Sequence, residues 1–422
     1  MTERRLAAVD AQTFWMSAAI PNDQFLLYAF EEGSAALDRA LREIQDRARV
    51  CAELSLRIVD DRFWAYPRWA RCGVGPEQFA VHEPAEGTWA GCLAAVAALA
   101  QNQLDPRAMT WRLHVFPTLE GVPGARRRGT VAVLQICHAL ADGARSSALA
   151  GYLFGRAGTV PGLVPQRQTA GRFALRAFSA GRAHRTLVRE TASGLIPDAA
   201  VSRPVLRTNA RPSGPRHCRT VICDRGRLPG PTITVGVLAR VSTALSGHVR
   251  ELGDDPSQLG AEVPMSKSGP RLANNHFGNI GVSLHPDVEI ESRAHRIAGD
   301  LRQRRRRANH PAMRAQDEAF AAIPAPLLRW GVSQFDPDVR SPTVTGNTVV
   351  SSVNRGARDL RFGAAPVLFT AGFPSLSPMM GLTHGVHGIG DVIAVSVHAA
   401  QSAIVDFDAY LERLERELRG EV

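Results

Sequence analysis

Lysine is almost absent from this chain of 422 residues. Lys267 is the single lysine among 50 basic residues, so arginine supplies nearly all of the positive charge behind a net charge of +10. Arginine stays charged at neutral pH and binds phosphate well, which leaves nucleic acid, an anionic membrane and a phosphorylated co-substrate open as partners. A GC-rich genome would favour arginine in the same way, so charge alone does not predict a function.

Long apolar runs and clustered cysteines are also missing. The near-apolar run at 92–100 covers about half of the ~18–20 residues that a spanning helix needs, and the first ten residues lack the apolar core of a secretion signal. The six cysteines stand singly along the chain, as is typical of buried thiols in a reducing compartment. We therefore expect a cytoplasmic protein with no spanning helix, no disulfide framework and no bound metal.

Several enzyme signatures do not occur in the sequence. It contains no Gly-Lys pair for a P-loop, no His-Glu-x-x-His, no Gly-x-Ser-x-Gly and no Gly-x-Gly-x-x-Gly. Nucleotide hydrolysis, zinc proteolysis and α/β-hydrolase chemistry are therefore unsupported. His384 and His387 stand among glycines in a predicted glycine-rich turn, and two histidines without a third ligand make a weak metal site.

Strand-like and helix-like segments alternate along the chain, which is long enough for two packed domains. The pattern predicts an α/β fold. Predicted strands lie at 52–60, 111–116, 130–137, 349–353, 367–370 and 392–398. Apolar residues at helical spacing predict helices that include 37–44, 89–99, 149–153, 237–245 and 411–418.

Residues 165–215 differ in composition from both flanking regions. Five arginines, from Arg172 to Arg189, are interleaved with Phe, Leu and Val, and a segment rich in Pro and Arg follows. This pattern predicts a basic amphipathic helix and a crossover between an N-terminal domain, 1–164, and a C-terminal domain, 216–422. A solvated crossover is favoured over a membrane-surface helix, and the arginine run at 304–307 is likewise interpreted as a solvated face.

The pattern His138-x-x-x-Asp142-Gly143 carries the strongest chemical signal. It follows the nearly all-apolar run at 130–137, which predicts a central buried strand. A neutral imidazole there can accept the proton of a hydroxyl that attacks a carbonyl. Asp142 is predicted to brace the loop and Gly143 to permit a close backbone approach. The alternative is a buried, hydrogen-bonded histidine at a strand end.

This pattern resembles the active-site motif of the chloramphenicol acetyltransferase-like superfamily. Within it, the order of segments along the whole chain is similar to the bacterial wax ester synthase/diacylglycerol acyltransferase family. The matching segments are Leu6–Ala11, Leu104-Asp105, Met109-Thr110-Trp111, Val263-Pro264, Phe277-Gly278-Asn279 and Val350-Ser351-Ser352-Val353. The chain departs from the family pattern at Cys137, where a first histidine is usual, at Thr234-Val235 in place of Asn-Asp, and at Asn354-Arg355-Gly356 in place of Pro-Gly-Pro.

The resemblance implies two similar α/β domains, each a mixed sheet with flanking helices, that meet along a tunnel with His138 at its midpoint. It implies His138 as general base, with Asp142 and Gly143 beside it, and candidate substrate or oxyanion contacts at Gly278, Asn279, Ser351 and Ser352. The partners would be acyl-CoA, as co-substrate and not as a bound cofactor, and a long-chain alcohol or diacylglycerol. Peripheral contact with the inner membrane or a lipid droplet is implied, and no nucleic acid is expected.

Two other functions stay open at this level. The departures at Cys137, Thr234, Val235 and Asn354 would suit a catalytically impaired relative that binds acyl chains or a partner protein. The charge alone would suit a basic nucleic-acid-binding protein, whose affinity would fall steeply with salt.

Overall fold

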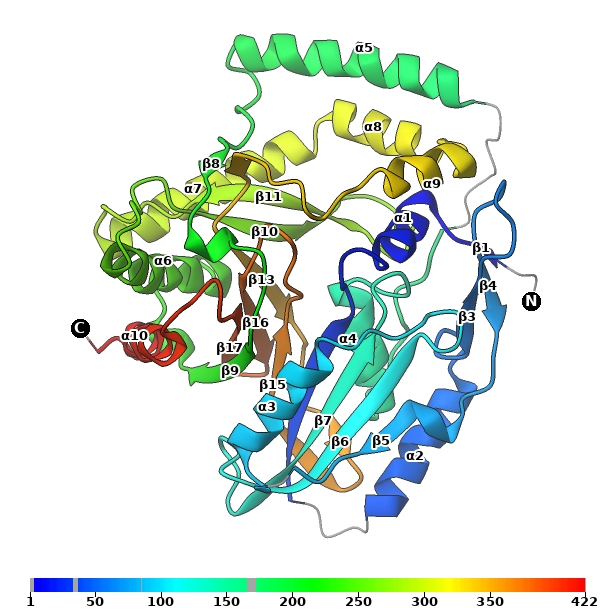
Figure 1. Ribbon diagram of the computed structural model, residues 1–422, viewed down its shortest axis with the longest axis vertical. Coiled ribbons are helices and arrows are strands. Elements are labelled where there is room, and N and C mark those ends of the chain that lie inside the picture. Colours follow the sequence, from blue (N-terminus) through cyan, green and yellow to red (C-terminus); the bar gives the residue numbers. More distant parts are fainter. Residues whose placement is uncertain (1–3, 33–36, 85, 165–171, 422) are drawn as a thin grey trace.

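The computed structural model describes residues 4–32, 37–84, 86–164 and 172–421, which form two six-stranded mixed sheets with flanking helices (Figure 1). The α/β prediction with two mixed sheets is therefore confirmed. The helices are α1 (Ala8–Met16), α2 (Leu37–Val50), α3 (Trp89–Leu99), α4 (Gly143–Leu153), α5 (Phe173–Ala192), α6 (Ile233–Glu251), α7 (Ile290–Ala308), α8 (Pro311–Ala321), α9 (Ala325–Ser333) and α10 (Phe407–Arg419).

The N-terminal sheet has the strand order β14-β15-β2-β7-β6-β5. Every residue of β7 except the first is buried, and β7 pairs antiparallel with β2 on one side and with β6 on the other, so the predicted central strand is confirmed. The strands are β2 (Gln24–Glu31), β5 (Phe79–Val81), β6 (Trp111–Glu120), β7 (Arg128–Ile136), β14 (Arg361–Phe362) and β15 (Ala365–Phe373).

The C-terminal sheet has the order β11-β10-β13-β16-β17-β9. Its middle strands β10, β13 and β16 run parallel, and the remaining pairs are antiparallel. The strands are β9 (Arg216–Cys223), β10 (Gly260–Ser266), β11 (Phe277–Ser283), β13 (Thr348–Asn354), β16 (Leu382–Ile389) and β17 (Val392–Ala400). Two smaller sheets join β1 (Arg4–Arg5), β4 (Arg68–Arg71) and β3 (Leu56–Val59), and β8 (Arg203–Pro204) with β12 (Thr343–Val344).

The sheets do not follow the sequence division at residue 216 throughout. Strands β14 and β15 come from the C-terminal part of the chain, yet β15 pairs antiparallel with β2 over Phe373↔Phe25 to Val367↔Phe30. The predicted domain 216–422 therefore supplies one edge of the N-terminal sheet. Because all of β15 but Pro366 is buried, its apolar sequence suits a place beside β2 as well as a place among its sequence neighbours.

Three apolar clusters hold these layers together. One lies between the N-terminal sheet and α1, α2 and α4, and a second lies between the C-terminal sheet and α6, α7 and α10. The third joins the two halves: Leu93 and Val96 of α3 share it with Phe25 of β2, Cys218 of β9 and Ala394 of β17. The halves are thus packed against each other through an apolar contact around α3.

The histidine pair in the glycine-rich segment lies in strand β16, so the predicted turn there is wrong. His384 is fully buried, with Nδ1 2.8 Å from Thr348 Oγ1 and Nε2 2.6 Å from the Tyr410 hydroxyl. The glycines serve a close approach of β15 to β16, because a Cβ at Gly385 would lie 2.1 Å from the carbonyl oxygen of Gly372. Glycines are needed where two strands pack this closely, and they are also common in turns, so composition does not distinguish the two.

Within the described ranges, no helix is both long and apolar enough to cross a membrane. Over the same residues, no group of three or more His, Cys, Asp or Glu side chains is arranged to hold a metal ion.

Candidate active site

His138 lies in the connection between β7 and α4, two residues after the last residue of the strand. The backbone N–H of Cys137 donates to the carbonyl of Thr110 (2.9 Å), which fixes the start of this connection beside β6. The ring of His138 is half-buried, and its centroid is 5.5 Å from that of Phe277 on β11. The histidine of the N-terminal half therefore faces the C-terminal half.

The loop of residues 267–276, which joins β10 to β11, supplies the polar partner of His138. Nδ1 of His138 is 2.7 Å from Oδ1 of Asn275, and Nδ2 of Asn275 donates to the carbonyl of His138 (2.9 Å). Nδ2 of Asn275 also donates to Oδ1 of Asp10 (3.0 Å). The carbonyl of His138 and Oδ1 of Asp10 can only accept hydrogen bonds, so the amide nitrogen of Asn275 has to face them. The amide oxygen of Asn275 is then the atom that faces the ring of His138.

This arrangement determines which ring nitrogen carries the hydrogen. Because Asn275 Oδ1 can only accept, Nδ1 of His138 must donate, and the neutral ring then has its lone pair on Nε2. No described residue forms a hydrogen bond with Nε2. Burial lowers the pKa of His138 below its ordinary value, and the hydrogen bond to Asn275 and the charge of Asp142 oppose that shift. The ring is thus neutral at pH 7, with an acceptor nitrogen available.

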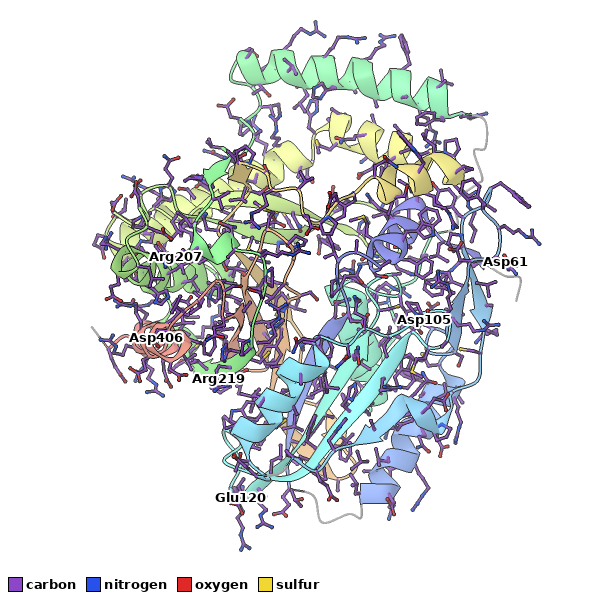
Figure 2. All side chains as sticks on the ribbon, viewed as in Figure 1. Asp61, Asp105, Glu120, Arg207, Arg219 and Asp406 are labelled. Carbon is purple, nitrogen blue, oxygen red and sulfur yellow. The ribbon has the colours of Figure 1, made fainter. Side chains whose placement is uncertain are left out.

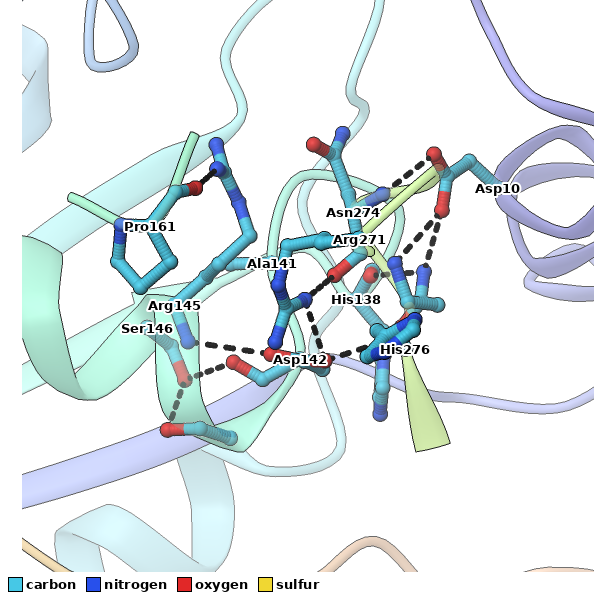
Figure 3. A network of polar contacts seen from close by, with 12 residues as sticks. Asp10, His138, Ala141, Asp142, Arg145, Ser146, Pro161, Arg271, Asn274 and His276 are labelled. Atoms are coloured by element: carbon cyan, nitrogen blue, oxygen red, sulfur yellow. Dashed lines mark hydrogen bonds and ion pairs between the residues drawn. The ribbon is translucent and has the colours of Figure 1, made fainter. Parts of the chain in front are cut away.

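Asp10, in the first turn of α1, holds Asn275 in place. Its carboxylate accepts the backbone N–H groups of Asn274 and Asn275, each at 2.9 Å, in addition to the Asn275 side chain (Figure 3). Asp10 is 1% exposed, and burial raises its pKa to about 6 despite these hydrogen bonds. Three donors on one buried carboxylate leave the asparagine little freedom to rotate.

Asp142 braces the same loop from the other side. Oδ1 accepts the backbone N–H of Arg145 (3.1 Å), so Asp142 is the N-cap of α4. Oδ2 accepts Nη1 of Arg271 (2.7 Å) and the backbone N–H of His276 (2.9 Å). Asp142 therefore pairs with an arginine of the opposite half, and its two oxygens are used in positioning, as Figure 3 shows.

Gly143 is the first residue of α4, where the helix approaches the C-terminal end of β13. A Cβ at this position would lie 3.3 Å from Cγ2 of Val353. A larger side chain would press on β13. The glycine thus permits the close contact of α4 with the opposite sheet.

The four candidates from the C-terminal half lie on the sheet that faces His138, but no contact joins them to its ring in the part of the chain that the structure describes. Asn279 is exposed and donates to Oε1 of Glu262 (2.5 Å), with Gly278 beside it on β11. Ser352 accepts from Oγ1 of Thr234 (2.9 Å) and so points toward α6. Ser351 alternates to the other side of β13, the side of Val353.

The structure also assigns local roles to the residues that depart from the family pattern. Cys137 is buried, and burial raises the pKa of its thiol, which makes it a poor nucleophile. Thr234 lies in the first turn of α6, two residues after the N-cap Thr232, and Val235 is buried. Asn354 accepts the backbone N–H of Gly356 (2.9 Å), and Nη1 of the buried Arg355 donates to the Tyr28 hydroxyl (2.9 Å).

Asn275, Asp10 and Arg271 are site residues that the sequence did not single out. Asn275 stands four residues before the candidate Asn279, and Asp10 belongs to the matching segment Leu6–Ala11. Asp10 thus lay inside a recognised segment, whereas Arg271 and Asn275 lie between two recognised segments, 263–264 and 277–279.

No family model matches the chain, and no curated protein matches it. Among solved structures, a wax ester synthase/diacylglycerol acyltransferase from Marinobacter aquaeolei VT8 superposes with a TM-score of 0.64 over 98% of each chain, at 19% identity. The chain has this acyltransferase's fold. A starter condensation domain of rhizomide synthetase in complex with C8-CoA superposes over 99% of this chain and 93% of that one, with a TM-score of 0.58 and 14% identity.

The wax ester synthase fold is therefore shared with condensation domains. The first condensation domain of the calcium-dependent antibiotic synthetase, in complex with a substrate analogue, also superposes, with a TM-score of 0.59 over 99% of this chain and 96% of that one at 15% identity. At these identities the likeness establishes the fold, and the chemistry has to be argued from the residues.

Proposed function

We propose that the chain is an acyltransferase that moves an acyl group from a coenzyme A thioester to the hydroxyl of a long-chain alcohol or of diacylglycerol. The observation that carries this proposal is the hydrogen bond between His138 Nδ1 and Asn275 Oδ1, which leaves Nε2 without a hydrogen-bond partner among the residues that the structure describes. A positioned neutral imidazole is the usual general base for a hydroxyl nucleophile.

In the proposed reaction, Nε2 of His138 takes the hydroxyl proton while the hydroxyl oxygen attacks the thioester carbonyl carbon. A C–O bond forms, and the carbonyl electron pair moves to the oxygen of a tetrahedral intermediate. When the intermediate collapses, the C–S bond breaks and the thiolate receives the proton from Nε2, which regenerates the base. Acyl-CoA is a co-substrate in this reaction, and no other cofactor takes part.

Ser351 is the candidate oxyanion donor under this proposal. It shares a side of β13 with Val353, which approaches Gly143 at the start of α4. One such donor typically contributes about 10²–10³ in rate. Ser352 is engaged with Thr234, and Asn279 with Glu262, so these two are weaker candidates.

The substrate classes are supported by the structural neighbours and not by contacts in this chain. One neighbour is named for wax ester and diacylglycerol acyl transfer, and another is in complex with C8-CoA. Both acceptors are lipids, so we also propose that the protein meets its acceptor at a membrane or lipid-droplet surface.

The test is thiol release from palmitoyl-CoA by the purified protein, with hexadecanol or dioleoylglycerol as acceptor and ester formation measured in parallel. His138→Ala is expected to lower kcat by about 10²–10⁴. His295→Ala is the matched control, because His295 is exposed on α7 and makes no contact at the site; its rate should stay within about twofold of wild type.

Three results would contradict the proposal. An unchanged rate in His138→Ala would exclude His138 as the general base. Bound acyl-CoA without turnover, with either acceptor, would indicate the impaired relative. Turnover with an amine acceptor alone would assign amide formation in place of ester formation.

A further inference from the structure

Helix α5 is attached to the rest of the protein along one side only. Leu187 is its buried residue, and the helix packs on α8 at the upper edge of the molecule in Figure 1. The opposite side carries large apolar side chains in solvent: Leu175 is 66% exposed, Phe178 63% and Val188 53%. An amphipathic helix normally buries such residues, and no residue in the described part of the chain covers them here.

Arginines of α7 hold the end of α5 in a fixed position. Nη2 of Arg306 donates to the carbonyl of Leu195 (2.7 Å), and Nη1 of Arg307 donates to that of Pro197 (2.8 Å) and to Thr191 Oγ1 (2.9 Å). The arginine run at 304–307, predicted as a solvated face, is therefore used in part to anchor the segment after α5. The exposed apolar side belongs to a helix that is held in place.

Three arginines share the exposed side of α5. Arg182, Arg185 and Arg189 lie four, seven and eleven residues after Phe178, which places them on one helix face. All three are exposed, and among the described residues no carboxylate forms an ion pair with any of them. The only acidic residue of α5, Glu190, contacts Nε2 of His310 (2.9 Å) on the packed side.

We propose that this outer face of α5, formed by Leu175, Phe178, Arg182, Arg185, Val188 and Arg189, binds the surface of an anionic phospholipid membrane. Its arginines would contact headgroup phosphates while Leu175, Phe178 and Val188 enter the boundary with the acyl chains. Each arginine near an anionic leaflet strengthens binding by roughly fivefold, so three together contribute roughly 100-fold. Figure 2 shows the side chains of α5 projecting away from the body along this edge.

Two other occupants fit this face less well. A second copy of the chain would bring three more arginines against these three, and like charges in contact are unfavourable. A nucleic acid would use the arginines but would leave Leu175, Phe178 and Val188 without an apolar partner.

The proposed function gives a reason for membrane binding, since a lipid acceptor would be met at such a surface, and the inference rests on it in that respect only. Binding itself needs no turnover. The two proposals can therefore fail separately: vesicle binding without acyl transfer retains the surface, and acyl transfer without vesicle binding retains the enzyme.

The experiment is co-sedimentation of the full chain with vesicles of phosphatidylcholine alone or with about 30% phosphatidylglycerol, at low and at high salt. Wild type is expected to prefer the anionic vesicles by at least tenfold and to lose that preference at high salt. Arg182→Glu with Arg185→Glu should abolish the preference, and Leu175→Ser with Phe178→Ser should weaken binding to anionic vesicles about tenfold.

The matched control is Arg126→Glu with Arg127→Glu, which makes the same charge change in the exposed loop between β6 and β7. This loop lies beside Glu120, at the end of the molecule opposite α5 in Figure 2. The control should keep most of the anionic preference. Equal losses in both double variants, or no effect of either α5 variant, would overturn the proposal. Tighter binding to duplex DNA than to vesicles would also overturn it.

Discussion

Two buried aspartates each hold a side-chain amide that in turn contacts a histidine, but the two chains of contacts end differently. Asp10 holds Asn275, and Asn275 contacts His138. Asp23 accepts Nε2 of Gln135 (2.7 Å), and Oε1 of Gln135 is 3.0 Å from Nε2 of His114. Nδ1 of His114 is 2.9 Å from Nε2 of His82, so both nitrogens of His114 are occupied.

The difference lies in location, since both sets combine an aspartate, a side-chain amide and a histidine. The chain from Asp23 to His114 lies within the N-terminal half, and His114 is 1% exposed. The chain of contacts from Asp10 to His138 runs through a loop of the C-terminal half and ends at Nε2, which has no hydrogen-bond partner in the described ranges. An aspartate, a side-chain amide and a histidine thus form a structural unit in one place and hold a candidate base in the other, which is why side-chain chemistry alone does not identify catalytic histidines.

The largest expected effect is a contrast between His114→Ala, which should lower stability, and His138→Ala, which should lower the reaction rate. His114→Ala leaves Gln135 Oε1 buried without a partner and opens a cavity, at a cost of about 3 kcal/mol in unfolding free energy. Its rate per folded molecule should match wild type, whereas His138→Ala loses rate and keeps most of its stability. Urea unfolding and active-fraction kinetics measure both quantities. A large rate loss in His114→Ala would end the distinction.

The two aspartates should respond differently to substitution by asparagine. Burial raises the pKa of Asp10 and of Asp23 to about 6 in the folded protein, from 3.8. Folding therefore disfavours the ionised form of each aspartate. The free energy of unfolding falls as pH rises from about 4 to 6, and above pH 6 the loss is roughly 3 kcal/mol for each aspartate. Both donors on Asp23 contact the single atom Oδ2, so Asp23→Asn can keep both and should be more stable than wild type at pH 7.

Asp10→Asn should gain less, because Asp10 uses both oxygens. One of them would become an NH₂ group that faces a backbone N–H, at a cost of about 1–3 kcal/mol. Stability curves at pH 4 and pH 7 for both variants provide the measurement. The gain of Asp23→Asn over wild type should shrink as pH falls toward 4; a gain that grows with acid would contradict the assignment.

The two amides should also differ when each is replaced by leucine. Asn275→Leu removes the acceptor that fixes the His138 tautomer and should lower kcat roughly 10- to 100-fold with little change in KM. Gln135→Leu should cost about 1–3 kcal/mol of stability and leave kcat unchanged. A change confined to KM in Asn275→Leu would indicate a substrate contact instead of a positioning residue.

The smallest expected effect is on the pH profile. The neutral form of His138 is the active one, and burial lowers its pKa, so kcat/KM should be lost as pH falls, with a midpoint below 6.5. Asn275→Leu removes a hydrogen bond that raises this pKa, so its midpoint should move further toward acid. Gln135→Leu should leave the midpoint in place, and a midpoint above 6.5 in wild type would contradict the assignment.

The local parts of this site could be predicted from the sequence, and the long-range parts could not. His138, Asp142 and Gly143 lie within six residues that follow an apolar run, so their strand–turn–helix context follows from local pattern. Asn275 is 137 residues from His138 and 265 from Asp10, and no periodicity reports contacts at that separation. The Gly-Asn pair at 278–279 drew attention to this part of the chain, but Asn275, which contacts His138, was not singled out.

The same limit applied to the fold. The strands at 349–353, 367–370 and 392–398 were predicted and are present as β13, β15 and β17. The place of β15 in the N-terminal sheet was not predicted, because an apolar strand carries no mark of the sheet that it joins. The glycines of β16 were taken for a turn, since composition does not distinguish a turn from two strands in close approach.

The pairing of β15 with β2 has a consequence for biosynthesis. A ribosome has to make residue 373 before the N-terminal sheet can be completed, although the other main strands of that sheet lie within the first 136 residues. Until then β2 is an open edge with unpaired backbone N–H and C=O groups and apolar side chains, the kind of surface that recruits strands from other nascent chains. Protein truncated after residue 216 should therefore aggregate, and delayed translation of the last third of the message should increase the need for chaperones.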